Sequence, residues 1–453
     1  MARFDAMANL DSFTMLRAFR DELYAGFGRR GDALFDLMDA LLTARPIPSV
    51  VHLSLEAAHR RGWGSLYAAL RRGTLDIEAL RALVARHPLE EGERVFAVDV
   101  SVWPRCDAET SPERGFYYHP SRHSNGKPIV AGWAYQWLAQ LSFARDSWTA
   151  PLDVQRVPPS QDVHEVAVEQ IKASLHRLPA GDPTVPLFVF DAGYDPVKLA
   201  LGLGDTRAAL LVRLRRDRCF YADADPAAYV GNGRPRRHGA KFVCQDPTTW
   251  PVPTAEYVTD DPLYGIVRVR AWSGLHAVTK THATVGSHQP RPIVRGTVIL
   301  VEVAQLPRQT RQPRQLWLFW HGPGEPDLRV IWQAYVRRFD VEHTLRFFKQ
   351  TLNWTAPQVR LPEQADRWTW LVLLSYTHLR LARLGVRDQR LPWERRLEAD
   401  KLTPTRVRRA FSAVRPLLGT PANAPKPCGR SPGRPRGRRS APAPVCPVLK
   451  KAA

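Results

Sequence analysis

Hydrophobic residues recur with the period of an α-helix over most of the first ninety residues. Helical spacing extends over 6–27 and 30–44, and a third stretch at 65–87 combines helical spacing with arginines on its polar positions. Prolines and glycines interrupt the pattern between these stretches, as expected where helices end. The pattern therefore predicts a helical N-terminal domain over residues 1–93.

After residue 93 the pattern changes to short apolar runs rich in β-branched and aromatic residues, which predict strands. Amphipathic stretches with helical period separate the later runs. The expected order is β-β-β-α-β-α-β, with strands at 94–103, twice within 128–143, at 186–195 and at 208–215, and helices at 162–178 and 195–203. Antiparallel strands followed by β/α crossovers predict an α/β fold with a mixed sheet.

Residues 216–326 break this alternation. They are rich in Gly and Pro and contain strand-like runs such as "YGIVRVRAW" and "GTVILVEVAQL", which predicts a β-rich insertion. Two helices are expected after it, at 335–350 and 366–384. The resulting domain boundaries are 1–93, 94–215, 216–326, 327–390 for the end of the core, 391–420 for a C-terminal helical segment, and 421–453 for the tail.

Charge changes the picture, because the 453-residue chain carries a formal net charge of +21. The tail holds eight Lys and Arg residues and no acid, and subtracting them still leaves +13 on the rest of the chain. Nucleic acid is the expected partner of such a chain. The tail has nothing to bury and is predicted to be disordered. The N-terminal domain, with Arg71, Arg72, Arg81 and Arg86, is either a DNA-binding bundle or a helical cap on the main domain.

Other classes of protein are disfavoured by the composition. The longest apolar run, residues 368–376, is too short to span a bilayer, and no secretory leader is evident. Five scattered cysteines without a C-x-x-C motif indicate neither a zinc ribbon nor a disulfide framework. We expect a reduced, cytoplasmic protein that does not bind membranes.

Two aspartates lie where apolar strands are expected. Asp99 falls in the middle of the strand at 94–103, and Asp191 ends the buried run "LFVFD". A buried, unpaired carboxylate is costly, so each needs a cation or hydrogen-bond donors. Asp195, which precedes Pro196, is instead interpreted as a helix cap. A strand-end aspartate taken alone is more often a turn or cap residue.

The stretch "YVRRFDVEHTLRFFKQ" adds a third acid. On a helical wheel Tyr335, Arg338, Glu342 and Lys349 fall at about 0°, 300°, 340° and 320°, on one narrow stripe. The neighbouring sector is apolar, with Val341, Leu345, Phe348 and Leu352, so the stripe borders the core. The simplest alternative is a surface Arg–Glu pair worth about 0.3–0.5 kcal/mol. Two aspartates and a glutamate on a basic chain instead favour metal-dependent phosphoryl transfer on nucleic acid.

These residues resemble one clan of bacterial DDE transposases. The spacing of Tyr335, Arg338, Glu342 and Lys349 matches the clan's Y-x2-R-x3-E-x6-K signature, and it follows a β-rich insertion as in that clan. "FDAGYD" is similar to the motif around the clan's second aspartate. Within the clan, "RRGWGSLYAAL", "KPIVAGWAYQW" and the Gly-Arg-Pro tail resemble insertion-sequence transposases of the cut-and-paste type. The resemblance covers roughly residues 94–385 and implies a ribonuclease H-like core.

The resemblance also implies roles for individual residues. Asp99, Asp191 and Glu342 would be the catalytic metal ligands, with Mg²⁺ or Mn²⁺ as cofactor and two ions in the site. Tyr335, Arg338 and Lys349 would contact the phosphates of transposon ends. The partners would be double-stranded DNA, both transposon ends and target, and a second copy of the chain in the DNA complex. The expected location is the bacterial cytoplasm, in association with the nucleoid.

Two rival functions stay open at this point. The rivals are a ribonuclease H-fold nuclease or resolvase that only cuts, and a non-catalytic DNA-binding protein derived from a transposase.

"GRPRGRR" at 433–439 is similar to a minor-groove AT-hook, although a nonspecific basic tail is the simpler interpretation. Arg122, His123 and Lys127 are either DNA contacts or solvated loop residues. For three tryptophans of the insertion region, core packing is favoured over contact with a flipped base: Trp272, Trp317 and Trp320.

Overall fold

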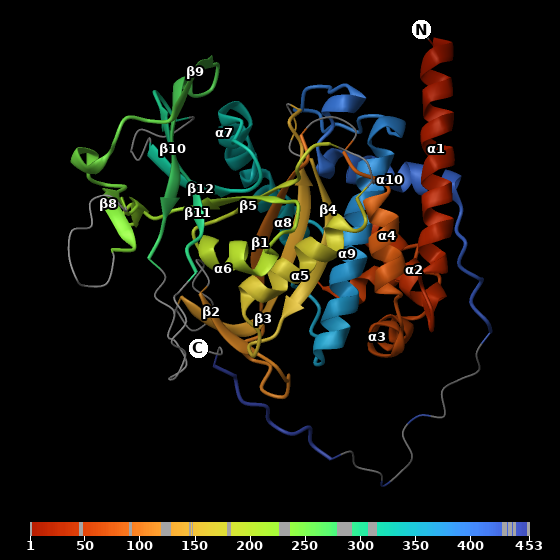
Figure 1. Ribbon diagram of the computed structural model, residues 1–453. Helices are drawn as coiled ribbons and strands as arrows, with labels where there is room; N and C mark the ends of the chain where they lie inside the picture. The colour runs from red at the N-terminus through yellow and green to blue at the C-terminus, as the bar shows by residue number, and fades with distance from the viewer. Residues whose placement is uncertain are drawn as a thin grey trace. The chain divides into compact units, whose positions relative to one another are not determined.

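The computed structural model shows a chain that divides into two compact units (Figure 1). The first comprises Met1–Glu91, Val100–Asp162 and Asp340–Ala453, and the second comprises Gly92–Asp99 and Val163–Phe339. The structure describes residues 2–44, 49–89, 93–118, 128–144, 146, 148–178, 183–225, 236–278, 292–306, 315–427, 433, 437 and 441–450, with the backbone only for residues 2–12.

The first unit is mainly helical around a long central helix. Helix α9 carries charged residues near its ends but is mainly apolar from 368 to 379, and it is buried along most of its length, as expected for a helix inside a core. It packs against α2, α3, α10 and β4 (Figure 1). The helices of this unit are α1 (Ala2–Ala25), α2 (Gly31–Thr43), α3 (Trp63–Arg72), α4 (Ile77–Ala85), α8 (Phe339–Gln350, with Phe339 in the second unit), α9 (Pro362–Ala382) and α10 (Pro404–Leu418).

The first unit also contains an antiparallel group of strands. β3 (Ile129–Leu141) pairs with β2 (Gly115–Tyr118) on one side and with β4 (Thr149–Val157) on the other. Here the sequence prediction was wrong in detail. Residues 128–143 were expected to form two strands, but they form one long strand with an irregularity in its pairing after Leu138, and β2 and β4 were not predicted.

The second unit is built on a large mixed sheet. Its strands follow the order β1-β5-β6-β12-β11-β10-β7-β8, and β9 pairs with β10. β1, β5 and β6 are parallel, and the strands after β6 in this order are antiparallel. The strands are β1 (Val95–Pro104, continuing into the first unit), β5 (Leu187–Phe190), β6 (Ala209–Arg213), β7 (Cys219–Asp223), β8 (His238–Val243), β9 (Ala255–Asp261), β10 (Gly265–His276), β11 (Arg295–Val303) and β12 (Gln315–His321).

Three helices accompany this sheet: α5 (Val163–Leu175), α6 (Pro196–Leu203) and α7 (Leu328–Arg337). Asp195 caps α6, since its carboxylate accepts hydrogen bonds from the backbone N–H groups of Val197 and Lys198 at 2.9 and 3.2 Å. The cap interpretation of Asp195 is therefore confirmed. Trp272 and Trp317 are buried in an aromatic core of the insertion, and Trp320 is buried as well, which confirms core packing for these tryptophans.

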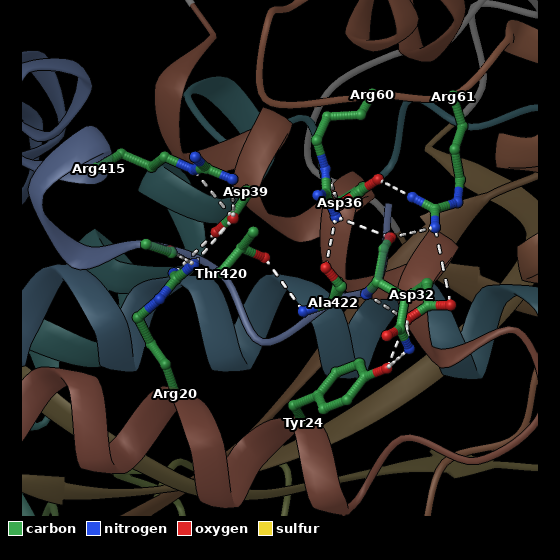
Figure 2. Close-up of polar contacts among 12 residues, drawn as sticks. Arg20, Tyr24, Asp32, Asp36, Asp39, Arg60, Arg61, Arg415, Thr420 and Ala422 are labelled. Carbon is green, nitrogen blue, oxygen red and sulfur yellow. Dashed lines mark hydrogen bonds and ion pairs between the residues drawn. The ribbon is translucent and has the colours of Figure 1, made fainter. Parts of the chain in front are cut away.

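A row of acids on α2 holds arginines from other segments of the first unit (Figure 2). Asp32, Asp36 and Asp39 share one face of the helix, and the side chains of Asp36 and Asp39 are completely buried. Asp39 pairs with Arg20 at 2.8 Å and with Arg415 of α10 at 3.0 Å. A buried carboxylate needs such partners to offset its lost hydration.

The same acidic row fixes the segment that follows α10. Arg60 donates a hydrogen bond to Asp36 at 2.8 Å and another to the carbonyl oxygen of Ala422 at 2.9 Å. Arg61 pairs with Asp36 and donates to the carbonyl oxygen of Asn423 at 2.7 Å. The beginning of the predicted tail is thus attached to the N-terminal helices by ion-paired arginines.

The far end of the tail also forms hydrogen bonds. The backbone N–H groups of Cys446 and Leu449 donate to the carbonyl oxygens of Glu109 and Arg114 at 2.8 and 2.7 Å. The Arg114 guanidinium returns a hydrogen bond to the Cys446 carbonyl oxygen at 2.8 Å. Ala422, Asn423 and residues 446–449 therefore differ from the predicted disorder, which stays a prediction for the remainder of the tail. Apart from Gly433 and Gly437, the AT-hook-like stretch lies outside the described residues, as do Arg122, His123 and Lys127.

Among the helices of the described chain, none combines the length and the hydrophobicity that crossing a membrane requires.

Candidate functional site: two strand carboxylates and an arginine

The two aspartates singled out in the sequence occupy matching positions on neighbouring strands of the second unit. β1 and β5 run parallel, with Val95 opposite Leu187, Phe96 opposite Phe188 and Ala97 opposite Val189. Each pair differs by 92 in residue number, and the same difference relates Asp99 to Asp191. The two aspartates stand two residues beyond the last paired positions, Ala97 and Val189, with Asp99 still on β1 and Asp191 just after the end of β5. Both carboxylates therefore lie beyond the carboxyl end of the pairing, where open α/β sheets place their sites.

Asp191 begins the turn between β5 and α6. Its Oδ1 atom accepts a hydrogen bond from the backbone N–H of Gly193 at 2.7 Å, which fixes one carboxylate oxygen. Tyr194 follows in the same turn, with its ring buried and 4.8 Å from that of Phe190 between centroids. Burial raises the pKa of Tyr194 well above its ordinary value, and the negative charges of Asp99 and Asp191 raise it further. Tyr194 is thus a neutral phenol beside both aspartates.

A buried arginine accompanies Asp99. Arg338 Nη1 lies 4.0 Å from Asp99 Oδ1, and the side chains are 9% and 19% exposed. The guanidinium group also lies over the ring of Tyr335, at 5.6 Å from its centroid. A cation in this position offsets the cost of keeping Asp99 ionised away from water. The sequence-predicted residues Asp99, Asp191, Tyr335 and Arg338 therefore belong to one unit, where both Asp99 and Tyr335 lie beside Arg338.

Tyr335 presents a buried polar atom close to two cations. Its hydroxyl oxygen forms no hydrogen bond of full geometry within the described part of the chain, but the guanidinium groups of Arg213 and Arg338 lie close enough to interact with it. Burial raises its pKa, against the opposing effect of Arg338 and of Arg213 at the end of β6. A neutral hydroxyl donor close to two guanidinium groups suits an anionic oxygen such as that of a phosphate. Arg213 was not singled out in the sequence, because it looks like any exposed strand-end arginine.

The helix carrying the remaining site residues is not continuous. The sequence predicted one helix over 335–350, but the structure has α7 ending at Arg337 and α8 beginning at Phe339. Arg338 itself keeps helical dihedral angles, with φ −52° and ψ −32°, so the interruption is slight. It nevertheless coincides with the division between the two units, which falls between Phe339 and Asp340.

Glu342 and Lys349 lie on α8 in the first unit, and both are half-buried. The apolar side of α8 matches the predicted sector, since Val341, Leu345 and Phe348 are buried. The Lys349 ammonium lies 5.8 Å from the centre of the Trp354 ring. The stripe therefore borders the core, as expected from the helical wheel.

Asp99 and Asp191 provide the hard oxygen donors that Mg²⁺ and Mn²⁺ prefer, from two adjacent strand positions. Across the described residues, no group of three or more His, Cys, Asp or Glu side chains is gathered so as to hold a metal ion. Glu342 belongs to the first unit and the two aspartates to the second. The convergence of three carboxylates accordingly stays a prediction, and so does metal binding by the two aspartates, although their oxygen atoms are of the kind that divalent cations prefer.

A comparison with protein families identifies the class to which this fold and site belong. The model of the DDE superfamily endonuclease family matches residues 22–277, which is more than half of the chain. The chain belongs to the DDE superfamily endonuclease family, and thus to a transposase-like family of nucleases and transposases that act on DNA. The matched residues include Asp99 and Asp191 and end before Tyr335. A comparison with curated proteins finds no match.

Proposed function

We propose that this protein is a DDE-type DNA transposase of the insertion-sequence, cut-and-paste kind. It hydrolyses DNA at transposon ends and then joins the freed 3′-OH to target DNA, without a covalent protein–DNA intermediate. The observation that carries the proposal is the matched register of Asp99 and Asp191, with Arg338 beside Asp99. Membership of a DDE endonuclease family and a net charge of +21 support a DNA substrate.

In this proposal Asp99, Asp191 and Glu342 hold two Mg²⁺ or Mn²⁺ ions. When bound, such ions activate the attacking oxygen and stabilise the leaving one. The chain itself contributes the carboxylates on neighbouring strands, and the backbone N–H of Gly193 that fixes one oxygen of Asp191. Fixing a ligand before the substrate arrives reduces the entropy lost in reaching the reactive arrangement.

Tyr335, Arg338 and Lys349 have the proposed role of holding the phosphates of the transposon end. Arg grips a phosphate with two parallel hydrogen bonds, Lys attracts it as a point charge, and Tyr donates through its hydroxyl. The buried hydroxyl of Tyr335 and the nearby Arg213 support this role. Such contacts position the reacting phosphate and carry no sequence information by themselves.

Two further features belong to the proposal. Cutting and joining both ends of one element requires two catalytic centres, so the active complex contains two copies of the chain. The protein acts on the bacterial chromosome and is therefore associated with the nucleoid.

The experiment is strand transfer with purified protein, Mg²⁺, and a donor duplex taken from the genomic DNA that flanks the gene. The proposal expects cleavage at the element's ends and covalent joining of these ends to a target plasmid. Cleavage without joining would instead support a nuclease or resolvase of the same fold. DNA binding without cleavage, in Mg²⁺ and in Mn²⁺, would support a non-catalytic DNA-binding protein.

A further inference from the structure

The arginines of the N-terminal helices divide into two groups. Most of those with described side chains are engaged within the first unit: Arg17 with the Leu417 carbonyl oxygen, Arg20 with Asp39, Arg60 and Arg61 with Asp36, Arg81 with Glu78 and Asp153, and Arg86 with Glu22 (Figure 2 shows Arg20, Arg60 and Arg61). Two of the four arginines noted in the sequence, Arg81 and Arg86, are thus ion-paired.

The second group lies on two turns that hydrogen-bond to each other. The turn between α1 and α2 and the turn between α3 and α4 meet through the backbone bonds Gly28 N–H to Thr74 O, at 3.0 Å, and Thr74 N–H to Arg29 O, at 3.1 Å. Glycine is required at this meeting point. A Cβ atom on Gly28 would lie 2.5 Å from Thr74 Oγ1, and one on Gly73 would lie 2.5 Å from a backbone oxygen.

These paired turns bring four exposed arginines together: Arg29, Arg30, Arg71 and Arg72. The Arg29 side chain donates to the carbonyl oxygen of Arg72 at 2.5 Å, which ties one turn's arginine to the other turn. None of the four forms an ion pair with any described residue. Their charges therefore remain available to an external anion.

Arg30 is held in a conformation that side chains rarely adopt. Its φ of 58° and ψ of 27° lie in the left-handed region, where a residue other than glycine is strained. It stands at the N-terminus of α2 and provides no side-chain cap. Two arginines in the last turn of α3 are favoured by the helix dipole, but that effect does not account for Arg29 and Arg30.

A fifth arginine joins the group from α9. Arg367 donates to the carbonyl oxygen of Leu70, the residue before Arg71, at 2.7 Å. Burial lowers the pKa of Arg367, and the positive charge of Arg29 lowers it as well, against Glu363 and Asp366. Of these acids, Asp366 is already bonded to Tyr135 at 2.7 Å and to Arg156 at 3.1 Å.

The arginines adjoin a hollow of the first unit. Thr74, Leu75 and Arg367 line a cavity of about 500 Å³, whose wall also carries the ion-paired Arg81 and Arg156 and the acids Glu363 and Asp366. A cavity of this size, with polar groups on its wall and exposed arginines beside it, has room for a sugar–phosphate group.

We propose that Arg29, Arg30, Arg71, Arg72 and Arg367, here called the paired-turn arginines, form a surface that binds the phosphate backbone of duplex DNA. This inference rests on the proposed function, because it takes DNA as the partner. It assigns the DNA contact of the N-terminal helices to the paired turns, and it excludes Arg81 and Arg86. Backbone contacts of this kind add affinity without reading sequence.

The test is the salt dependence of binding to a fluorescently labelled duplex of arbitrary sequence, measured by anisotropy in EDTA. Each phosphate contact contributes about 0.9 to the slope of log K against log salt. The double variants R29Q/R30Q and R71Q/R72Q should each lower the slope by about 2, and the quadruple variant by about 3–4. The matched control is R86Q/R268Q, which removes two exposed arginines that pair with Glu22 and Glu256.

Circular dichroism melting verifies that each variant is folded. An unchanged slope in the folded quadruple variant would overturn the inference, as would an equal loss in the control. Because EDTA prevents metal-dependent chemistry, this result is independent of whether the protein transposes DNA. A wild-type protein that shows the expected slopes but never cleaves DNA would contradict the proposed function alone, and one that binds no duplex would contradict both.

Discussion

Asp99 on β1 and Asp191, the residue that follows β5, keep the 92-residue offset of the three paired positions that precede them on these parallel strands. This relationship follows from strand pairing and does not depend on side-chain rotamers. It brings two carboxylates to the carboxyl ends of neighbouring strands, where Arg338 lies beside Asp99 and the neutral phenol of Tyr194 senses both negative charges. The first consequence concerns metal binding.

Replacing either strand aspartate should reduce the affinity of the protein for Mn²⁺ by at least about tenfold, because each supplies an oxygen ligand. The measurement is Mn²⁺ titration by electron paramagnetic resonance with D99N and D191N. Asp195→Asn is the matched control, since Asp195 lies in the same turn but caps α6. It should lose about 1 kcal/mol of stability and keep its Mn²⁺ affinity. Equal loss in D195N would show that the turn, and not the carboxylate, matters.

Glu342→Gln should abolish strand cleavage and leave duplex binding within about twofold, because the change removes one ligand and hardly alters a basic surface. Asp340→Asn, two residues earlier on α8, is the control and should cleave normally. Gel shifts and a cleavage assay in Mg²⁺ distinguish the two effects. Cleavage by E342Q at the wild-type rate would remove Glu342 from the metal site.

Arg338→Gln and Tyr335→Phe should slow cleavage at saturating DNA by about 10²-fold or more, because a misplaced phosphate reacts poorly. Total DNA affinity should fall much less.

Truncation after Pro427 removes seven of the eight cations of the tail and keeps Ala422 and Asn423, which Arg60 and Arg61 hold. It should weaken binding and lower the salt slope, with cleavage at saturating DNA unchanged. If the truncated chain binds normally and cleaves slowly, this division of roles is wrong.

Asp39→Asn should destabilise the first unit by about 3–5 kcal/mol, because it leaves Arg20 without its buried carboxylate partner and weakens the hold on Arg415. Asp32→Asn is the control on the same helix face, and its 33% exposed carboxylate should matter less. Urea unfolding followed by tryptophan fluorescence measures the difference. A change of less than about 1 kcal/mol in D39N would mean that water replaces the carboxylate.

The lowered pKa of His378 makes the free energy of unfolding depend on pH. Burial, helped by the charge of Arg20, lowers the pKa of this α9 histidine to about 3, against opposing effects of the Leu374 carbonyl and Asp39. The folded protein therefore keeps His378 neutral while the unfolded chain takes up a proton below pH 6.5. Stability is full above that pH and falls as the pH drops toward 3, by about 1.4 kcal/mol per unit.

The check is the free energy of unfolding of wild type and H378L, obtained from thermal melts between pH 7 and pH 4. The wild type should lose about 3 kcal/mol more than H378L over this interval, because a leucine side chain cannot take up a proton. His343→Gln, at an exposed position of α8, is the control and should follow the wild type. Parallel pH profiles of H378L and wild type would contradict the assignment.

Several parts of this structure were predictable because they depend on local sequence. The continuous apolar runs around Asp99 and Asp191 are typical of strands buried on both faces, and the burial of Val341, Leu345 and Phe348 follows from helical spacing. The cap at Asp195 is equally local, since an aspartate before proline suits a helix start. In each case the deciding partners lie within a few residues.

Other parts depend on partners that are distant in the sequence. β4 contains Pro151 and Asp153, which disfavour a strand prediction, yet Asp153 is satisfied by Arg81 at 2.7 Å, 72 residues away. Asp36 and Asp39 look like solvated helix residues until Arg20, Arg60 and Arg415 are brought to them by tertiary packing. The break at Arg338 leaves no local signal, because its backbone dihedral angles remain helical.

The account depends most on Asp99 and Asp191 acting together in metal-dependent chemistry. Its most direct test is the rate of strand cleavage of the element's end at saturating DNA, with and without Mg²⁺, for wild type, D99N and D191N. The account predicts Mg²⁺-dependent cleavage by the wild type, and a loss of at least about 10³-fold in each variant despite normal DNA binding. Cleavage by either variant at the wild-type rate, or wild-type cleavage that does not require a divalent metal, would contradict it.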